Sequence, residues 1–322
     1  MNNHRFQLEK YKSGSSRYTC PSCGGRREFS RYIDTVTGEY VHDTVGRCNR
    51  LDSCGYHYPP REYFKNNGID LGNIPANQQV ISERSIEPPS LVDPDILIKS
   101  LACYEVNNFT QFLVNTFGKE KATEAVERYY IGTSKKWQGA TVFWQIDIHG
   151  SIRTGKIMLY EPTTGERIKK VGSYISWVHS ECGLDNFNLV QCLFGEHLLT
   201  DDFQKPVAIV QSDKTVVIAS LLLPDILWLA TGGKEGLNEA KAKVLKGRDV
   251  MLFPDAGCYD KWRKIADRLK HVCNIGISGV LEYNITEAEK INGYDIADYM
   301  LVQYKAGVHV HVQDEREQCE QM

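Results

Sequence analysis

Four cysteines near the start of the chain have the spacing of metal ligands. They form two pairs, Cys20-x2-Cys23 and Cys48-x5-Cys54, and Gly and Pro residues of the kind found in tight turns flank them. Two such pairs can close a tetrahedral thiolate cage around one Zn²⁺. We therefore expect a structural zinc ion with these four residues as its ligands.

Two alternatives concern the same cysteines. Disulfides are typical of secreted chains, but the opening MNNHRFQLEKYK lacks the apolar core of a signal peptide. No stretch approaches the roughly 18 apolar residues of a membrane span, so we expect a cytoplasmic protein without a membrane partner. Because the second pair is wider than the usual two-residue gap, His42 or His57 could replace one thiolate.

The segment that carries the cysteines also has the residue types that contact nucleic acid. Tyr32-Ile33 and Tyr40-Val41, with a turn at Thr37-Gly38 between them, predict a β-hairpin and hence a zinc ribbon. Arginines in and around it alternate with Tyr18, Phe29 and Tyr32, and these residue types can bind a nucleic-acid backbone and stack on bases. These candidate nucleic-acid contacts are Arg26, Arg27, Arg31, Arg47 and Arg50, and Arg153 and Lys156 on a strand of the middle region extend the set. The alternative is a solvated charged face with aromatic residues that support a small core.

Charge supports nucleic-acid contact by this segment. Residues 1–65 hold 11 Lys and Arg against 7 Asp and Glu, a balance of +4, whereas the rest holds 27 against 34, a balance of −7. Phosphates are attracted to the local excess rather than to the net charge of −3. We expect nucleic acid, and single-stranded DNA in particular, as the partner.

The rest of the chain divides by pattern. Residues 1–65 form the ribbon, and 66–90 are polar, end in a Pro pair and predict a linker. Helical patterns, the first capped by Asp93, and antiparallel-strand patterns, the last at ERIKKV, follow over 91–204. Short apolar runs that alternate with helices over 205–310, one of them at GGKEGLNEAKAKVL, predict a parallel sheet covered on both faces. The expected fold class is α+β with an α/β C-terminal part: a zinc β-ribbon, a small mixed middle region and a parallel-sheet domain.

Functional residues of parallel sheets lie beyond the carboxyl ends of the strands. Here these ends carry Gln211, the turn Thr231-Gly232-Gly233-Lys234, and Asp255. Lys234 lies in a glycine turn before a helix and Lys214 lies at a helix start, so either could hold a phosphate. Ordinary strand-to-helix geometry and a solvated lysine are the competing interpretations.

The order of these parts resembles bacterial and phage primases, with a zinc ribbon, a mixed region and then a Toprim domain. The ribbon and residues 140–298 carry the resemblance, including the segment YYIGTSKKWQGATVFWQIDIHGSIRTGKIMLYEPTTG before the parallel sheet. The whole chain resembles primase-like proteins carried by mobile elements of Bacteroides-type bacteria. The resemblance implies replication or transfer of mobile DNA, a replicative helicase as partner, and Mg²⁺ at the sheet.

Toprim chemistry needs a Glu after the first strand and an Asp-x-Asp pair after the third, and this chain departs from both. Gln211 stands at the Glu position, Asp255 matches the first Asp, and Gly257 stands at the second. The substitutes nearest in sequence are Asp213, Glu235 and Asp260. Asp298, in GYDIADYM, resembles a downstream acidic motif of phage primases, but Asp295 and Asp298 also fit a helix N-cap and its third helical position.

Three functions therefore stay open from the sequence. The first is a primase-like protein that acts on DNA and would use Asp255, the Gln211 position and Asp298 for catalysis. The second is a zinc-ribbon binding module that has lost its catalytic acids, and the third is a Toprim nuclease that would need the same missing carboxylates. Whether the protein is an enzyme depends on Gln211, because an amide can neither exchange a proton near pH 7 nor hold Mg²⁺ well.

Overall fold

The computed structural model describes residues 5–11, 16–50, 54–67, 69, 88–169, 174–184, 186–233 and 236–312. The chain divides into two compact units, Met1–Arg84 and Ser85–Met322, which are described separately. Most of the predicted linker over 66–90 lies outside the described residues, as do Lys234 and Glu235.

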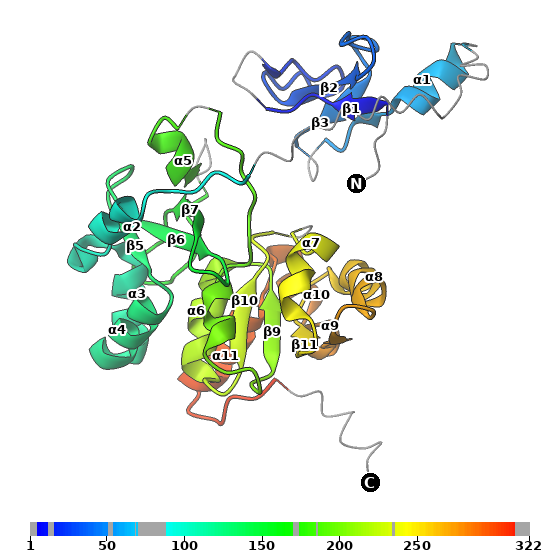
Figure 1. The fold of residues 1–322 in the computed structure, drawn as a ribbon. Coiled ribbons are helices and arrows are strands. Elements are labelled where there is room, and N and C mark those ends of the chain that lie inside the picture. Colours follow the sequence, from blue (N-terminus) through cyan, green and yellow to red (C-terminus); the bar gives the residue numbers. More distant parts are fainter. Residues whose placement is uncertain are drawn as a thin grey trace. The chain divides into compact units, whose positions relative to one another are not determined.

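The first unit is a four-stranded antiparallel sheet followed by one helix (Figure 1). In chain order its elements are β1 (Phe6–Leu8), β2 (Phe29–Asp34), β3 (Gly46–Cys48), β4 (His57–Tyr58) and α1 (Pro60–Asn66). The predicted turn after β2 is confirmed. The Gly38 N–H donates to the Asp34 carbonyl at 2.8 Å, and Gly38 has a φ of 76°, a left-handed conformation that glycine adopts without strain.

The core of this unit is very small. Phe29 is fully buried together with Cys20 and Cys48, and Tyr18, Cys54 and Tyr56 pack around them. A core of this size supplies little hydrophobic stabilisation, so small domains of this kind commonly depend on a metal or disulfides.

The second unit begins with helices and an antiparallel sheet. Its elements are α2 (Pro94–Ser100), η2 (Tyr104–Val106), α3 (Asn108–Phe117), α4 (Lys119–Arg128), β5 (Gly132–Ser134), β6 (Ala140–Ile146), β7 (Ile152–Met158), β8 (Ile175–Trp177), α5 (Val178–Glu181) and η3 (Glu196–Thr200). The strands lie in the order β5-β6-β7-β8. At the start of α2, the predicted cap is confirmed, because the Asp93 carboxylate accepts from the Asp95 N–H at 2.9 Å.

A second, parallel sheet completes this unit. Its elements are β9 (Val207–Val210), α6 (Asp213–Leu222), β10 (Leu227–Ala230), α7 (Glu239–Ala242), η4 (Lys243–Leu245), β11 (Asp249–Leu252), α8 (Tyr259–Leu269), β12 (Asn274–Ile277), α9 (Val280–Asn284), α10 (Glu287–Asn292) and α11 (Ile296–Lys305). The strand order is β10-β9-β11-β12, and every pair is parallel.

The strand order decides which helices cover which face. The chain reverses direction across the sheet after β10, so right-handed crossovers place α6 on one face and α7 and α8 on the other. Figure 1 shows this arrangement, and α11 packs against α6. The carboxyl ends of β9, β10 and β11 therefore meet at one edge, which we call the crevice: Gln211, Asp213, Lys214, Thr231–Gly233 and Asp255.

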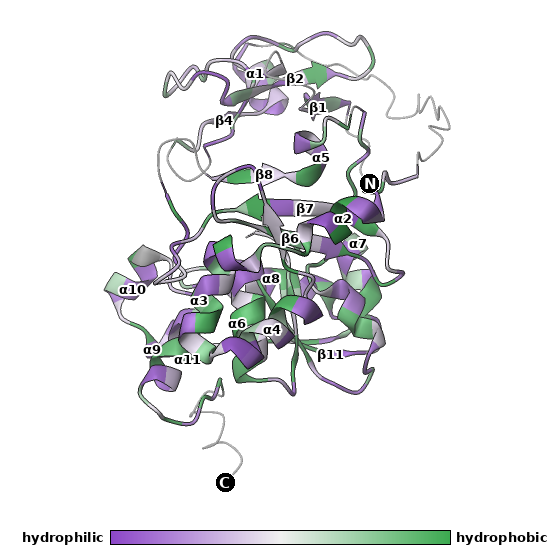
Figure 2. Ribbon diagram, turned by 90° about the vertical axis from the view of Figure 1, so that its left-hand side faces the viewer, coloured by the Kyte–Doolittle hydropathy of each residue, from purple (hydrophilic) through white to green (hydrophobic). Residues whose placement is uncertain are grey.

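One hydrophobic core joins the helices α3 and α4 to the parallel sheet. It includes Phe109, Phe143, Val207 and Trp228, all with 0% of their surface exposed. Strands β9 and β10 are buried along their whole length, which explains their unbroken apolar sequence. Figure 2 shows hydrophilic and hydrophobic residues side by side on the helices, as expected for helices that cover a core. The predicted division of this unit at residues 204/205 stays a prediction.

The predicted fold class is confirmed, with two local differences. The helix predicted over GGKEGLNEAKAKVL is reduced to α7 and η4, two short turns of four and three residues. The strand predicted at ERIKKV is represented by one isolated bridge between Tyr160 and Arg167, and residues 170–173 lie outside the described part. The described residues include no helix with the length and hydrophobicity that crossing a membrane requires.

Candidate functional site

The four predicted zinc ligands lie together in the first unit. The sulfur atoms of Cys20 and Cys54 are 3.8 Å apart, those of Cys23 and Cys48 are 4.0 Å apart, and all four lie within 4.8 Å of one another. A tetrahedral site with Zn–S bonds of about 2.3 Å separates its sulfur atoms by about 3.8 Å. The four thiols therefore fit one zinc ion.

Backbone turns bring the cysteines together. In the first pair the Gly24 N–H donates to the Cys20 carbonyl at 3.0 Å, and in the second the Cys54 N–H donates to the Arg50 carbonyl at 3.0 Å. The sulfur atoms accept backbone hydrogen bonds as well. The Tyr56 N–H lowers the pKa of Cys54 to about 7, whereas burial raises the pKa of Cys48 to about 12. A metal ion would supply the positive charge that a buried thiolate requires.

The two histidines considered as replacement ligands have other partners. His42 Nδ1 is 2.9 Å from the Thr44 hydroxyl, and its ring stacks on Tyr63 at 5.0 Å between centroids. His57 Nε2 is 2.9 Å from the Tyr32 hydroxyl. Neither histidine belongs to the converging group of ligand atoms. The structure therefore favours the four-cysteine ligand set.

The predicted arginines of the ribbon differ in their surroundings. The Arg31 guanidinium lies 3.9 Å from the centroid of the Tyr18 ring and 2.8 Å from the Asp43 carboxylate, so it is partly engaged within the unit. Arg50 lies 3.7 Å from Glu28. Arg26 and Arg27 are exposed beside the first cysteine pair, and Arg47 is half-buried on β3.

In the crevice, Gln211 and Asp255 contact each other directly. With the Gln211 amide oriented by its neighbours, its nitrogen donates to Asp255 Oδ2 at 3.2 Å and its oxygen accepts from the Asp255 N–H at 3.1 Å. Gln211 is 4% exposed. A Glu at this position would bring a second carboxylate against Asp255, so the amide replaces a like-charge contact with hydrogen bonds.

Lys214 connects the start of α6 to the start of α11. Its Nζ lies 3.8 Å from Asp295 Oδ2 and 3.8 Å from Asp298 Oδ1. The Thr215 hydroxyl also donates to Asp295 at 2.7 Å. Burial lowers the pKa of Lys214, but the carboxylates around it, including Asp255, outweigh burial and raise this pKa above its usual value.

Asp298 takes part in the cap of α11 in addition to its pairing with Lys214. The predicted helix capping is confirmed, because Asp295 and Asp298 each accept the backbone N–H of the other at 3.0 Å in a capping box. The Ala256 N–H also donates to the Tyr294 carbonyl at 3.0 Å, which ties the loop after β11 to the start of α11. The cap of α11 thus lies beside the crevice.

The substitutes proposed from sequence do not assemble a metal site. Asp213 pairs with Lys156 at 3.3 Å, Asp260 pairs with Arg263 at 3.3 Å on the surface, and Glu235 lies outside the described residues. Among the described residues, the ligand atoms of the four cysteines converge within 4.8 Å of one another. The crevice acids do not form a group of three or more that converges in this way. The Mg²⁺ that the resemblance implies therefore does not fit the residues present.

The other predicted contacts from the middle sheet are held by partners inside the unit. Arg153 donates through Nε to Asp147 Oδ2 at 2.7 Å and so stabilises the turn between β6 and β7. Lys156 reaches the crevice, where its Nζ donates to the Gly232 carbonyl at 3.4 Å. The structure adds Lys241, whose Nζ donates to the Thr231 carbonyl at 3.3 Å. No sequence signal indicated Lys241, because it lies ten positions after Thr231 and no motif links the two residues.

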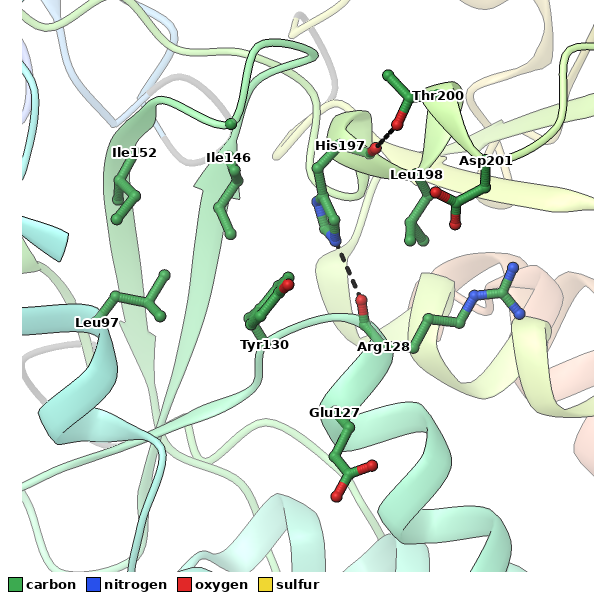
Figure 3. A pocket seen from close by; sticks show the side chains of 11 residues that line it. Leu97, Glu127, Arg128, Tyr130, Ile146, Ile152, His197, Leu198, Thr200 and Asp201 are labelled. Atoms are coloured by element: carbon green, nitrogen blue, oxygen red, sulfur yellow. Dashed lines mark hydrogen bonds between the residues drawn. The ribbon is translucent and has the colours of Figure 1, made fainter.

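A separate cavity of about 570 Å³ lies between α2, α4, η3 and the turn after β6 (Figure 3). Its lining includes Leu97, Tyr130, Ile152 and His197. Figure 3 shows the His197 ring pointing toward the Arg128 carbonyl, from which Nε2 is 3.1 Å away. Burial lowers the pKa of His197. No residue of the crevice lines this cavity.

Two family models match parts of the chain. Residues 4–69 match a family described as a putative zinc β-ribbon finger, in agreement with the cysteine geometry. Residues 107–256 match a domain of unknown function, DUF6371. A comparison with curated proteins gave no match.

Solved structures similar to this chain include three primase fragments. The primase fragment of the bacteriophage T7 primase-helicase is 13% identical, covers 89% of this chain and 98% of its own, and has a TM-score of 0.35. The Escherichia coli primase catalytic core is 11% identical, with 66% and 74% covered and a TM-score of 0.40. The zinc-binding and RNA polymerase domains of Aquifex aeolicus primase are 12% identical, with 92% and 77% covered and a TM-score of 0.37. At these identities and TM-scores, the similarities decide neither the activity nor the ligands of this chain.

Proposed function

We propose that this protein is a primase-like nucleic-acid-binding protein whose zinc ribbon holds single-stranded DNA. We further propose that its parallel-sheet domain is a degenerate Toprim-like domain without catalytic activity. The observation that carries the proposal is the contrast between four converging thiols in the ribbon and a crevice whose acid position holds an amide.

Binding by the ribbon is supported by charge and by residue type. The ribbon segment holds the positive excess of the chain, and Arg26 and Arg27 are exposed next to the zinc ligand Cys23. Tyr32, Tyr40 and Tyr63 add aromatic rings on the same small unit. Bases stack on such rings with little sequence preference, whereas arginines attract the phosphates.

Loss of catalysis is supported by the chemistry of Gln211. Its amide carries no charge for a metal ion and cannot act as a general acid or base, and it occupies hydrogen-bonding groups of Asp255. Active primer synthesis is the second candidate function. It is favoured by the position of Asp255 at the carboxyl end of the parallel sheet, and it would need Asp298 and Mg²⁺ in addition.

The resemblance stated from sequence supports a finer proposal for the biological setting. It suggests a cytoplasmic role in the replication or transfer of mobile DNA, with a replicative helicase as a partner. The third candidate, a Toprim nuclease, needs the carboxylates that this crevice lacks.

Two assays on the full-length, zinc-loaded protein test the proposal. Binding to labelled single-stranded DNA is measured over a series of salt concentrations, before and after zinc removal by a chelator. We expect binding that weakens steeply with salt and is lost with zinc. A flat salt response, or unchanged binding without zinc, would contradict the assignment to the ribbon.

Primer synthesis on single-stranded DNA with Mg²⁺ or Mn²⁺ tests the second part, using the unaltered protein and Gln211→Glu. We expect no synthesis by the unaltered protein. Synthesis by that protein would replace the binding proposal with the primase proposal. Synthesis by Gln211→Glu alone would identify Gln211 as the residue that abolished an otherwise complete active site.

A further inference from the structure

We infer that the ammonium group of Lys214 takes the place of a divalent cation among the crevice carboxylates, so that the crevice binds neither Mg²⁺ nor Mn²⁺. This inference deepens the proposed loss of catalysis, but it concerns metal binding, which is measured independently of DNA binding and activity.

The position of Lys214 is the first reason. Its Nζ lies at the same distance, 3.8 Å, from the carboxylates of Asp295 and Asp298, which are held by the capping box at the start of α11. The Lys214 side chain is only 14% exposed. The ammonium is therefore largely enclosed among the acids rather than extended into solvent.

The electrostatic surroundings give a second reason. Asp255 and Glu166 also act on Lys214, and together with Asp295 and Asp298 they overcome the effect of burial on the pKa of this lysine. A single ammonium thus interacts with four carboxylates that come from separate parts of the second unit. A divalent cation bound to these acids would lie close to the ammonium, where two positive charges repel strongly.

Asp255 supplies the third reason. Its Oδ2 accepts a hydrogen bond from the Gln211 amide nitrogen, and its backbone N–H donates to the Gln211 amide oxygen. Mg²⁺ requires nearly octahedral oxygen ligands at about 2.0–2.1 Å, commonly including one or two carboxylates. Metal binding at Asp255 would have to displace the amide and would bring the metal's charge near the Lys214 ammonium, which is covalently attached and present at every metal concentration.

The experiment measures Mn²⁺ binding by electron paramagnetic resonance on the full-length protein with its ribbon loaded with zinc. Mn²⁺ prefers oxygen ligands and competes poorly with zinc for thiolates. Three proteins are compared: the unaltered chain, Lys214→Met, and Lys136→Met as the matched control. The control also removes a lysine paired with a carboxylate, Glu181, in the same unit but outside the crevice.

We expect no bound Mn²⁺ in the unaltered protein or the control, and about one Mn²⁺ per chain in Lys214→Met. In thermal unfolding, Lys214→Met should melt below the unaltered protein without metal. Mn²⁺ at about 100 times its dissociation constant should then raise that midpoint by roughly 5–10 °C.

Bound Mn²⁺ in the unaltered protein, if abolished by Asp255→Asn, would overturn the inference even when Lys214→Met does not fold. A folded Lys214→Met protein without Mn²⁺ binding or metal-dependent stabilisation would also overturn it. Single-stranded DNA binding is measured on the same samples. Failure of DNA binding alone would contradict the proposed function and leave the conclusion about Lys214 intact.

Discussion

The ribbon and the crevice both gather potential metal ligands, but they do so in opposite electrostatic states. In the ribbon, four cysteine sulfur atoms lie within 4.8 Å of one another. In the crevice, Lys214 is already paired with Asp295 and Asp298, and Gln211 is bonded to Asp255. One site needs a cation from solution, whereas the other has a cation in its own sequence.

The comparison shows that acidic residues near one another do not by themselves make a metal site. A divalent cation binds where ligand charge is left unneutralised and where ligand atoms converge. The ribbon meets both conditions, whereas in the crevice the Lys214 ammonium already neutralises Asp295 and Asp298 and lies 3.8 Å from each of them. The variants below change one of these conditions at a time.

The largest effect is expected in the ribbon. Cys20→Ser combined with Cys23→Ser removes two thiolates, so zinc should be lost and the first unit should unfold, because its core is too small to replace a contribution of about 10–16 kcal/mol. Metal analysis should give about one zinc per unaltered chain and none in the double variant. Full zinc occupancy in the variant would show that the ligands are wrongly assigned.

The next effect comes from removing the internal cation of the crevice. Lys214→Met leaves buried carboxylates without their partner, and we expect a loss of about 3–5 kcal/mol at pH 7, measured by urea unfolding. Burial and Asp295 already raise the pKa of Asp298, and loss of the lysine raises it further.

The pH dependence of Lys214→Met follows from the raised pKa of Asp298 in the folded protein. A carboxyl whose pKa is higher in the folded state than in the unfolded state binds its proton more tightly when folded, so it stabilises the fold as pH falls. The deficit of Lys214→Met should therefore shrink between pH 7 and about pH 4. A deficit that stays constant over this range would show that lost packing, rather than lost charge, causes it.

A smaller effect is expected at Gln211. Gln211→Glu places a second carboxylate against Asp255 and should destabilise the protein by about 1–3 kcal/mol at pH 7, and less at acidic pH where the pair shares a proton. Gln211→Met is the matched control, because it removes the hydrogen bonds without adding charge. Equal loss and equal pH dependence in both variants would exclude charge repulsion as the cause.

The smallest effect concerns the exposed arginines of the ribbon. Arg26→Ala with Arg27→Ala should leave zinc content unchanged, weaken single-stranded DNA binding at every salt concentration, and reduce the slope of log K against log salt by about 1.4. Arg263→Ala with Lys270→Ala removes the same charge from the surface of α8 and its end, and should leave the slope unchanged.

The parts of the fold that could be predicted from the sequence depend mostly on short-range sequence patterns. The turn at Gly38, the cap at Asp93 and the buried strand β9 follow from glycine conformation, side-chain capping and apolar burial, which act over a few residues. The short form of α7 did not follow. Its sequence has good helix-forming residues, but α7 spans only four residues, and its Lys241 side chain donates to the Thr231 carbonyl.

The sequence by itself determined the zinc ligands and the absence of an acid at position 211, because cysteine spacing and residue identity are local properties. Only the tertiary structure showed that Lys214, on α6, lies among carboxylates from α11 and from the loop after β11. Lys214 is more than 40 positions from each of these carboxylates in the chain, and the parallel sheet brings them together by placing its strand ends at one edge. Charge neutralisation depends on such distances, which no local pattern encodes.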